Sequence, residues 1–243
     1  MSWRHGVTRT MRVAGVSLAV FLAGASLARA ADWIELFNGK DLTGWKPKGP
    51  AEKSKWTVGT AKLKADDPRF LEVTPGGHEL INALAKGEHS LDFYTEAKFG
   101  DAILEIEVMV PKGSNSGIYV MGEYEIQVLD SFGRPKVGPG DMGGIYGRTA
   151  PLVNASKAPG EWQKYVIEYR APKFDAEGKK IVNTRVVKIT LNDQVIHDNV
   201  EVKGSTGGPL VGKEAPTGAL MLQGNHGAVA FRNIRIKPLE AAK

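Results

Sequence analysis

The sequence contains no cysteine among its 243 residues. This absence excludes disulfide bonds, thiol nucleophiles, cysteine zinc sites and lipid attachment through cysteine. Helical periodicity is almost absent as well, and there are no internal repeats, coiled-coil heptads or low-complexity tracts. Apolar residues at 42% and charged residues at 24% are ordinary for a globular protein, so the composition excludes a disordered chain.

The excess of positive charge lies in the first 30 residues. Four of the 32 basic residues and none of the 27 acidic residues lie there, so the remaining 213 residues carry 28 basic and 27 acidic side chains. A nearly neutral chain lacks the basic surface that binds nucleic acid, and we therefore expect no nucleic-acid partner.

Residues 1–30 have the pattern of a secretory signal peptide. Arginines precede an apolar run of 15 residues at 13–27, and Ala28-Arg29-Ala30 forms a small-x-small cleavage site. The run is shorter than the ~20 residues of a membrane-spanning helix, and an uncleaved anchor is the alternative. We expect a signal peptide at 1–30, a single domain at 31–243 with no membrane span, and export to the periplasm or beyond in a bacterium.

Short alternating runs between turn residues predict an all-β fold. Residues 104–110 alternate strictly before Pro111, and the runs 117–121 and 124–129 form a hairpin. Further strands are expected at 162–169, 184–191, 194–196, 220–223 and 229–236, with one short helix at 76–85. Many short strands in one undivided chain indicate a sandwich of two antiparallel sheets, and the length favours a jelly roll over an immunoglobulin-like domain.

Alternation also predicts which side chains share the face opposite the core. Tyr119, Glu125, Gln127 and Gln223 fall on that face of their strands. A surface of carboxylate, amide and aromatic groups suits sugars, which need hydrogen bonds together with an apolar platform. Glu105 and Glu107 join this surface if their strand belongs to the same sheet, and otherwise they form a solvated face.

Two glycine-rich segments match nucleotide-binding motifs only in part. Residues 138–143 fit G-x-G-x-x-G without a preceding strand or a following helix. Residues 207–213 begin like a P-loop, but Glu214 replaces the Ser or Thr that would hold magnesium. Both segments are interpreted as loops.

The histidines differ in their surroundings. His226 lies in Gln223-Gly224-Asn225-His226-Gly227, where glycines allow a ligand to approach the backbone, so we assign it a functional role. His197 lies near a strand end and is interpreted as a structural hydrogen-bonding residue.

Ordinary glycoside hydrolysis needs two carboxylates, ~5–5.5 Å apart for retention and ~6.5–9.5 Å apart for inversion. The run 125–129 offers Glu125, Gln127 and Leu129 on one face, which is a single carboxylate. Asp130 lies an odd number of residues after Glu125, so its side chain is expected on the opposite face. The sequence therefore argues against two-carboxylate hydrolysis by this strand.

The run Phe37-Asn38-Gly39-Lys40-Asp41-Leu42-Thr43-Gly44-Trp45 resembles the opening of the 3-keto-disaccharide hydrolase domain family. Other stretches follow in the family's order, at residues 115–119, 124–130, 144–147, 159–162, 222–227 and 231–234. The resemblance covers residues 34–239. It implies a concanavalin-like jelly-roll β-sandwich, in agreement with the strand pattern.

The resemblance also implies an unusual route to glycosidic cleavage. Family members act on glycosides oxidised to a ketone at C3, where the ketone acidifies the C2 proton and the aglycone leaves from C1 by elimination. Water then adds to the enone, and individual members resemble hydrolases, lyases or hydratases. The expected substrate is thus a 3-keto-sugar or another carbohydrate. A non-catalytic lectin-like module is the main alternative, and an ordinary glycosidase ranks third.

Such an elimination needs a base, an acid and a group that stabilises the enolate. Either Glu125 or His226 is expected to be the base at C2, with the other as acid or ligand orienter. Arg148 is expected to stabilise the enolate, unless it only pairs with Asp141. A divalent metal ion bound by Glu125 and His226 is the alternative electrophile, and no other cofactor is expected.

Three further residues are assigned to substrate binding. Gln127 and Gln223 are expected to hydrogen-bond sugar hydroxyls, and Tyr119 is expected to be a stacking platform.

Overall fold

The structure, a computed structural model, describes residues 1–3, 6 and 32–240. The chain divides into two compact units, Met1–Ala30 and Ala31–Lys243, and the description below concerns the second. The predicted signal peptide lies outside the described residues except for four of them. Within the described part, no helix has the length and apolar character needed to cross a membrane.

Strands make up nearly all of the regular structure in the described part. In chain order the elements are β1 (Ile34–Glu35), β2 (Trp45–Pro47), the 3-10 helix η1 (Ala51–Lys53), β3 (Trp56–Leu63), β4 (Leu71–Asn82), β5 (Phe93–Phe99), β6 (Ala102–Met109), β7 (Asn115–Val120), β8 (Tyr124–Leu129), β9 (Trp162–Arg170), β10 (Lys173–Phe174), β11 (Lys180–Val182), β12 (Thr184–Leu191), β13 (Gln194–Val202), β14 (Gly218–Leu222) and β15 (Val229–Pro238).

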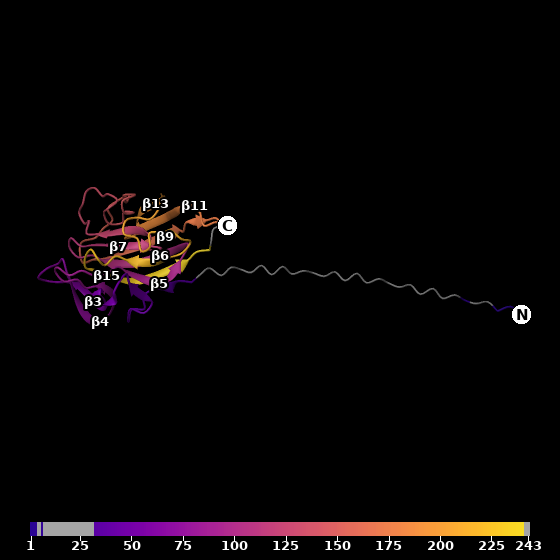
Figure 1. Ribbon diagram of the computed structural model, residues 1–243, viewed down its shortest axis with the longest axis horizontal. Coiled ribbons are helices and arrows are strands. Elements are labelled where there is room, and N and C mark those ends of the chain that lie inside the picture. The colour runs from indigo at the N-terminus through magenta and orange to yellow at the C-terminus, as the bar shows by residue number, and fades with distance from the viewer. Residues whose placement is uncertain (4–5, 7–31, 241–243) are drawn as a thin grey trace. The chain divides into compact units, whose positions relative to one another are not determined.

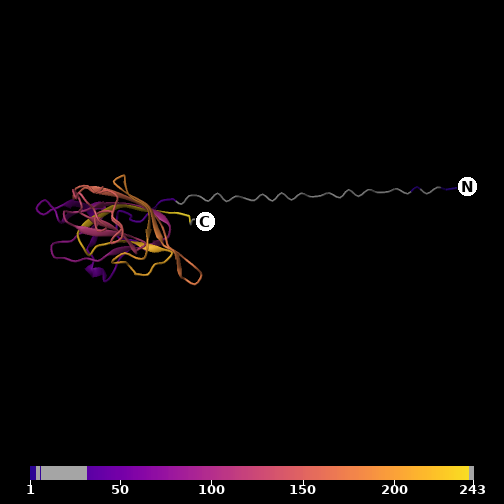
Figure 2. The same cartoon turned by 90° about the horizontal axis from the view of Figure 1, so that it is seen from above.

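The strands form two large antiparallel sheets. The first has the order β13-β12-β9-β6-β15-β4-β3, with β1 paired to β15, and the second has the order β2-β5-β14-β7-β8 (Figure 1). A small ribbon of β10 and β11 extends away from the sheets (Figure 2). The all-β jelly-roll sandwich expected from the sequence is confirmed.

A row of aromatic rings joins the two sheets through the core. Trp45 of β2 stacks on Phe93 of β5, with ring centroids 5.6 Å apart, and Phe93 stacks on Trp56 of β3 at 5.4 Å. Trp56 in turn lies 6.2 Å from Phe231 of β15. Each ring is at least 95% buried, so this row contributes a large share of the hydrophobic stabilisation.

Two expectations from the sequence are corrected here. The helix expected at 76–85 is wrong, because residues up to Asn82 belong to β4 and pair with β3. Gly77 passes so close to β3 that a Cβ there would lie 2.1 Å from Thr60 Oγ1. Glu105 and Glu107 lie on β6 of the larger sheet, where they pair with arginines of β15, and not on the sheet that carries Glu125.

The aromatic row makes a prediction about stability. Phe231→Ala is expected to lower the free energy of unfolding by about 3–5 kcal/mol, because it removes a fully buried ring and leaves a cavity. The matched control is Phe132→Ala in an exposed loop, which is expected to change stability by less than about 0.5 kcal/mol. Urea unfolding of both variants tests this, and equal losses would contradict it.

Candidate active site

The β7–β8 hairpin turns a polar face away from the core. Tyr119 lies opposite Glu125, and Gly117 lies opposite Gln127, in the antiparallel register. Ile126 between the two β8 residues packs into the hydrophobic core. Because side chains alternate along a strand, Glu125 and Gln127 project from the other face, as the sequence predicts.

This face forms the floor of a cavity of about 220 Å³. We call it the glycone cavity, after the ligand that the resemblance in the sequence leads us to expect. It is lined by Asn115, Tyr119, Glu125, Gln127, Tyr146, Gly207, Gly208, Gln223 and His226. Five of the six site residues predicted from the sequence are therefore brought together around one space.

Arg148 is the predicted residue that does not line the cavity. A tight turn closes between Ile145 and Thr149, and the Arg148 guanidinium donates a hydrogen bond to the Ser205 carbonyl at 3.0 Å. Asp141 pairs with Arg134 instead of Arg148. The aromatic ring of Tyr146 takes a place in the cavity wall, so the expected enolate-stabilising role of Arg148 lacks support from its position.

Glu125 has an unusual environment for a carboxyl group. It is 2% exposed, and this burial raises its pKa to about 7. The Tyr119 hydroxyl nearby lowers the pKa, and the negative charge of Asp92 raises it further. A carboxyl group with a pKa near neutrality is suited to take up and release a proton at physiological pH.

Tyr119 fixes the orientation of its neighbour Gln223. The Tyr119 hydroxyl donates to the Gly207 carbonyl at 2.9 Å, so its lone pair accepts from Gln223 Nε2 at 3.2 Å. Gln223 Oε1 is left buried without a hydrogen-bond partner, and so is Asn115 Oδ1. A buried acceptor without a partner costs about 1–3 kcal/mol, which a ligand with hydroxyl donors would recover.

The burial of Tyr119 also changes its expected role. It is 1% exposed, so its ring has little free surface on which a sugar could stack. Tyr146 is 41% exposed and lines the same cavity, which makes it the better aromatic platform.

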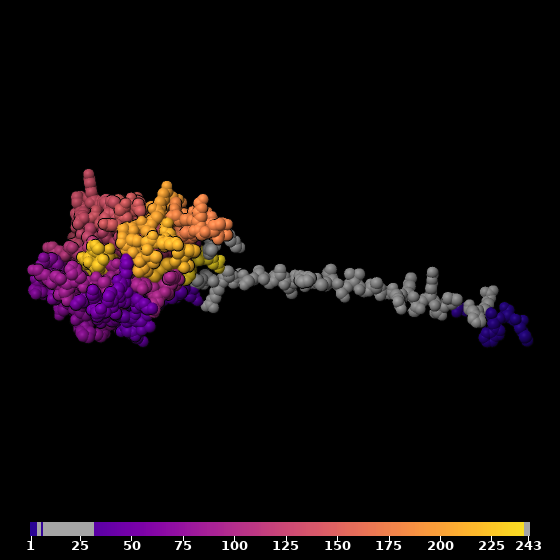
Figure 3. All heavy atoms as spheres, viewed as in Figure 1, coloured from indigo at the N-terminus to yellow at the C-terminus, as the bar shows by residue number. Residues whose placement is uncertain are grey.

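The segment 204–212 covers one side of the glycone cavity and belongs to the amber surface in Figure 3. Thr206 binds β8 and the turn before it, since its N–H donates to the Glu123 carbonyl at 2.9 Å and its Oγ1 accepts from the Glu125 N–H at 2.8 Å. The buried Glu123 carboxylate accepts from the Gly212 N–H at 3.1 Å. A Cβ at Gly208 would lie 3.0 Å from the Tyr119 hydroxyl, and the backbone there has a φ of +70°, so the position favours glycine.

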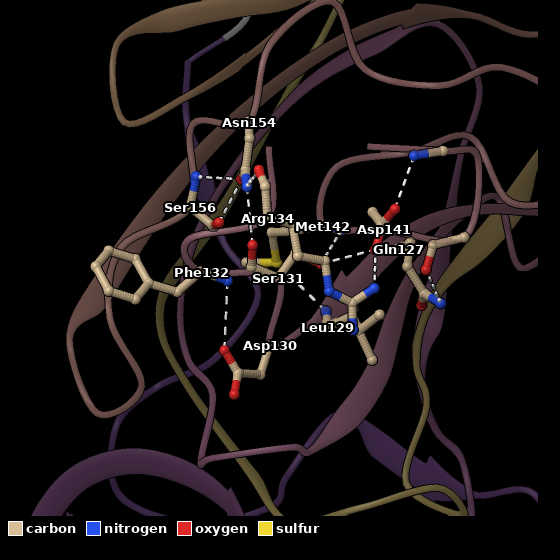
Figure 4. A network of polar contacts seen from close by, with 12 residues as sticks. Gln127, Leu129, Asp130, Ser131, Phe132, Arg134, Asp141, Met142, Asn154 and Ser156 are labelled. Atoms are coloured by element: carbon tan, nitrogen blue, oxygen red, sulfur yellow. Dashed lines mark hydrogen bonds and ion pairs between the residues drawn. The ribbon is translucent and has the colours of Figure 1, made fainter. Parts of the chain in front are cut away.

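The loop after β8, which contributes Tyr146 to the cavity wall, is held by a polar network (Figure 4). Asp141 pairs with Arg134 and accepts from the Gly138 N–H at 2.7 Å. Ser131 Oγ accepts from the Met142 N–H at 3.0 Å. Gln127 Nε2 donates to the Gly140 carbonyl at 3.1 Å, which ties the cavity floor to this loop.

The two histidines singled out in the sequence have separate environments. His197 is buried, and Nε2 lies 2.8 Å from the Gly143 carbonyl, while burial lowers its pKa. This is the structural hydrogen bond expected for it. His226 is exposed on the loop after β14 and is hydrogen-bonded to the Asn225 side chain. Asn82 anchors that loop by donating to the carbonyls of two of its glycines, at 2.7 and 2.9 Å.

Comparison with known proteins identifies the family of the chain. The profile of the 3-keto-alpha-glucoside-1,2-lyase-like domain family matches residues 32–237. The chain belongs to this family. The family resemblance drawn from the sequence motifs is therefore confirmed.

Two solved structures of candidate glycosyl hydrolases from Parabacteroides distasonis ATCC 8503 are similar to this lyase-like domain. One is 33% identical, with a TM-score of 0.65, and the match covers 86% of this chain and 84% of that one. The other is 19% identical, with a TM-score of 0.58, and the match covers 86% of this chain and 94% of that one. This likeness shows a shared fold. No protein with a curated description matches the chain in sequence.

Some residues of the lyase-like domain's cavity were missed in the sequence. Tyr146 and Asn115 lie within stretches that resemble the family, but nothing in their local pattern indicates that they face the cavity. Gly207 and Gly208 were interpreted only as part of a loop. Their place depends on contacts with strands more than 80 residues away in the chain, such as the bond between Tyr119 and Gly207.

A divalent metal ion was the alternative electrophile. In the described ranges, no group of three or more His, Cys, Asp and Glu side chains could hold a metal ion. Glu125 and His226 line the glycone cavity, but its other polar side chains are amides and tyrosines. Catalytic zinc sites use three protein ligands, so this set does not fit such a metal site, and no step below is derived through a metal.

The position of the Glu125 carboxyl depends on glycine at residue 117. A Cβ at Gly117 would lie 2.3 Å from Glu125 Oε1, so Gly117→Ala is expected to destabilise the fold by about 1–3 kcal/mol. In a Glu125→Ala background the same change is expected to cost less than about 0.5 kcal/mol, because the clash is gone. Chemical denaturation of the four proteins gives the coupling energy.

The control for this cycle is Gly140→Ala, where an added Cβ meets no atom within 4 Å. Its effect is expected to be the same in both backgrounds. A Gly117→Ala cost that is unchanged by Glu125→Ala would show that the two positions are independent.

Proposed function

We propose that this domain cleaves 3-keto-glycosides by elimination, with Glu125 as the base that removes the C2 proton. The observation that carries the proposal is the Glu125 carboxyl, buried in the glycone cavity with its pKa raised to about 7. A ketone at C3 acidifies the C2 proton, so a carboxylate of this basicity can remove it. Membership of the 3-keto-alpha-glucoside-1,2-lyase-like family supports the same chemistry.

The content of the cavity argues against ordinary hydrolysis. Of the described residues that line it, Glu125 alone carries a carboxylate. Retaining and inverting glycosidases both use a pair of carboxyl groups on opposite sides of the bond. Elimination needs one base at C2, and a single buried carboxyl is sufficient for that step.

The remaining polar groups fit a polyhydroxylated ligand. The unpartnered oxygens Gln223 Oε1 and Asn115 Oδ1 can each accept a hydrogen bond from a sugar hydroxyl. The exposed ring of Tyr146 offers an apolar surface to a sugar ring. The N-terminal segment supports the further proposal that the enzyme acts after export from a bacterial cytoplasm.

Paired chromogenic substrates test the proposed reaction. The enzyme is expected to release nitrophenol from 4-nitrophenyl 3-keto-glucoside and not from 4-nitrophenyl glucoside, because only the ketone acidifies C2. Repeating the assay with EDTA tests the metal alternative. Release from the unoxidised glucoside would overturn the proposal, and sugar binding without turnover of either substrate would favour a lectin-like module.

The pH dependence tests the role of Glu125. The base must be ionised, and 4-nitrophenolate departs without a proton. For 4-nitrophenyl 3-keto-glucoside, kcat/KM is therefore expected to rise with pH through an apparent pKa of about 7 and then level off. Glu125→Gln is expected to lower kcat by about 10²–10⁴-fold. The matched control Glu72→Gln changes an exposed carboxylate on β4 of the other sheet and is expected to keep the wild-type profile. A Glu125→Gln enzyme with wild-type activity would exclude Glu125 as the base.

A further inference from the structure

A second cavity of about 340 Å³ adjoins the glycone cavity at His226. His226 lines both cavities, and the consecutive residues Asn115 and Ser114 line one each. We infer that this second space binds the leaving group of the substrate, as a second sugar ring, and that His226 protonates the departing oxygen. The inference rests on the proposed elimination and extends it to the substrate's other half.

The size of the glycone cavity supports a divided site. Cavities that hold drug-sized ligands have volumes of about 300–1,000 Å³, so 220 Å³ suits a single ring. A disaccharide bound through one ring must place its other ring in adjoining space. The cavity that shares His226 provides such space.

Another cavity of the described part is a less suitable place for the second sugar ring. It has a volume of about 730 Å³ and shares no lining residue with the glycone cavity. The segment that contains Pro209 and Leu210 lies between the two spaces. This segment is fastened down, because the Lys48 ammonium donates to the Pro209 carbonyl at 2.8 Å and the Leu210 N–H donates to the Gly122 carbonyl at 2.6 Å.

The leaving-group cavity, as we call the 340 Å³ space, offers free hydrogen-bond donors. Arg69 is held by Asp67 at 2.6 and 2.8 Å, and Glu88 is held by Lys55 at 2.9 Å. The free donors in the same wall belong to two other side chains, Lys112 and His89.

Within residues 32–240, the Lys112 ammonium and the His89 ring have no side-chain partner. Both can therefore donate to the hydroxyls of a sugar. Leu84 and Ala228 add apolar surface to the same wall, so the cavity combines the two kinds of contact that a sugar ring uses.

The sequence leaves open which of Glu125 and His226 is the base and which is the acid. The position of His226 assigns these roles. With one ring in each cavity, the glycosidic oxygen lies at their junction, where His226 is. Glu125 takes the C2 proton, the C2–H electron pair forms the C1=C2 bond, and the C1–O bond breaks. The electron pair of that bond goes to the leaving oxygen, which takes a proton from the His226 imidazolium and departs as a neutral alcohol. The products are an enone, neutral His226 and protonated Glu125.

The leaving-group cavity is tested with substrates that differ only in the leaving group. We compare kcat/KM for a 3-keto disaccharide, such as 3-keto-cellobiose or 3-keto-maltose, with kcat/KM for methyl 3-keto-glucoside. Lys112→Ala and Ala85→Trp are each expected to lower the ratio of the two values by about fivefold or more. Lys62→Ala, on an exposed position of β3, is expected to keep the wild-type ratio. An unchanged ratio in both cavity variants would overturn this assignment.

The role of His226 is tested by the basicity of the leaving group. His226→Gln is expected to slow release of methanol from the methyl glycoside by about 10²-fold or more. Release of 4-nitrophenolate is expected to slow by a much smaller factor, because this anion departs without a proton. Equal losses with both leaving groups would show that His226 is not the acid.

If the proposed elimination itself is wrong, the result differs from that of a wrong leaving-group cavity. It would leave the wild-type enzyme inactive on every 3-keto substrate, whatever the leaving group. Calorimetry with cellobiose and glucose then tests the second cavity by binding alone. Lys112→Ala is expected to weaken binding of the disaccharide by a larger factor than binding of glucose, and equal effects on the two sugars would overturn the inference.

Discussion

The site depends on the removal of one carboxyl group, that of Glu125, from water. Burial raises its pKa from 4.5 to about 7, so the folded protein holds a proton that the unfolded chain releases. This group therefore makes the fold less stable as the pH rises from about 4.5 to about 7. Its neighbours maintain the burial: glycine at 117 leaves room for the carboxyl, and Thr206 ties the 204–212 segment over it.

Burial of the Glu125 carboxyl lowers the stability of the fold, and the rest of the sandwich offsets this loss. The larger sheet carries ion pairs on its outer face, such as Arg235 with Glu105 at 2.7 Å, but partly exposed pairs contribute at most about 1 kcal/mol each. The aromatic row through Phe93 and Trp56 removes far more apolar surface from water. Most of the stability therefore comes from packing between the sheets. The outer face of the smaller sheet can then tolerate buried oxygens without a hydrogen-bond partner, those of Gln223 and Asn115.

The sequence predicted what alternation controls and missed what long-range contacts control. The parity of β8 placed Glu125 and Gln127 on one face. Their register with Tyr119 is set by a turn of three residues, 121–123, whereas the sequence indicated a turn of two. Whether Tyr146 or Arg148 faces the cavity depends on how the tight turn at 145–149 closes. The periodicity of the sequence does not reveal how a turn closes. The apolar pair Leu80-Ile81 was compatible with a helix, and its pairing with β3 made it a strand buried on both faces.

In the proposed mechanism, the inferred pair of groups would also allow one site to act as a lyase or as a hydrolase. After elimination Glu125 carries a proton and His226 has lost one, which are the states needed to add water to the enone. His226 then accepts a proton from water as its oxygen bonds to C1, and Glu125 returns a proton to C2. This is the elimination in reverse with water in place of the alcohol. The outcome therefore depends on whether the enone leaves before water occupies the leaving-group cavity, and the chemistry at Glu125 is the same in both cases.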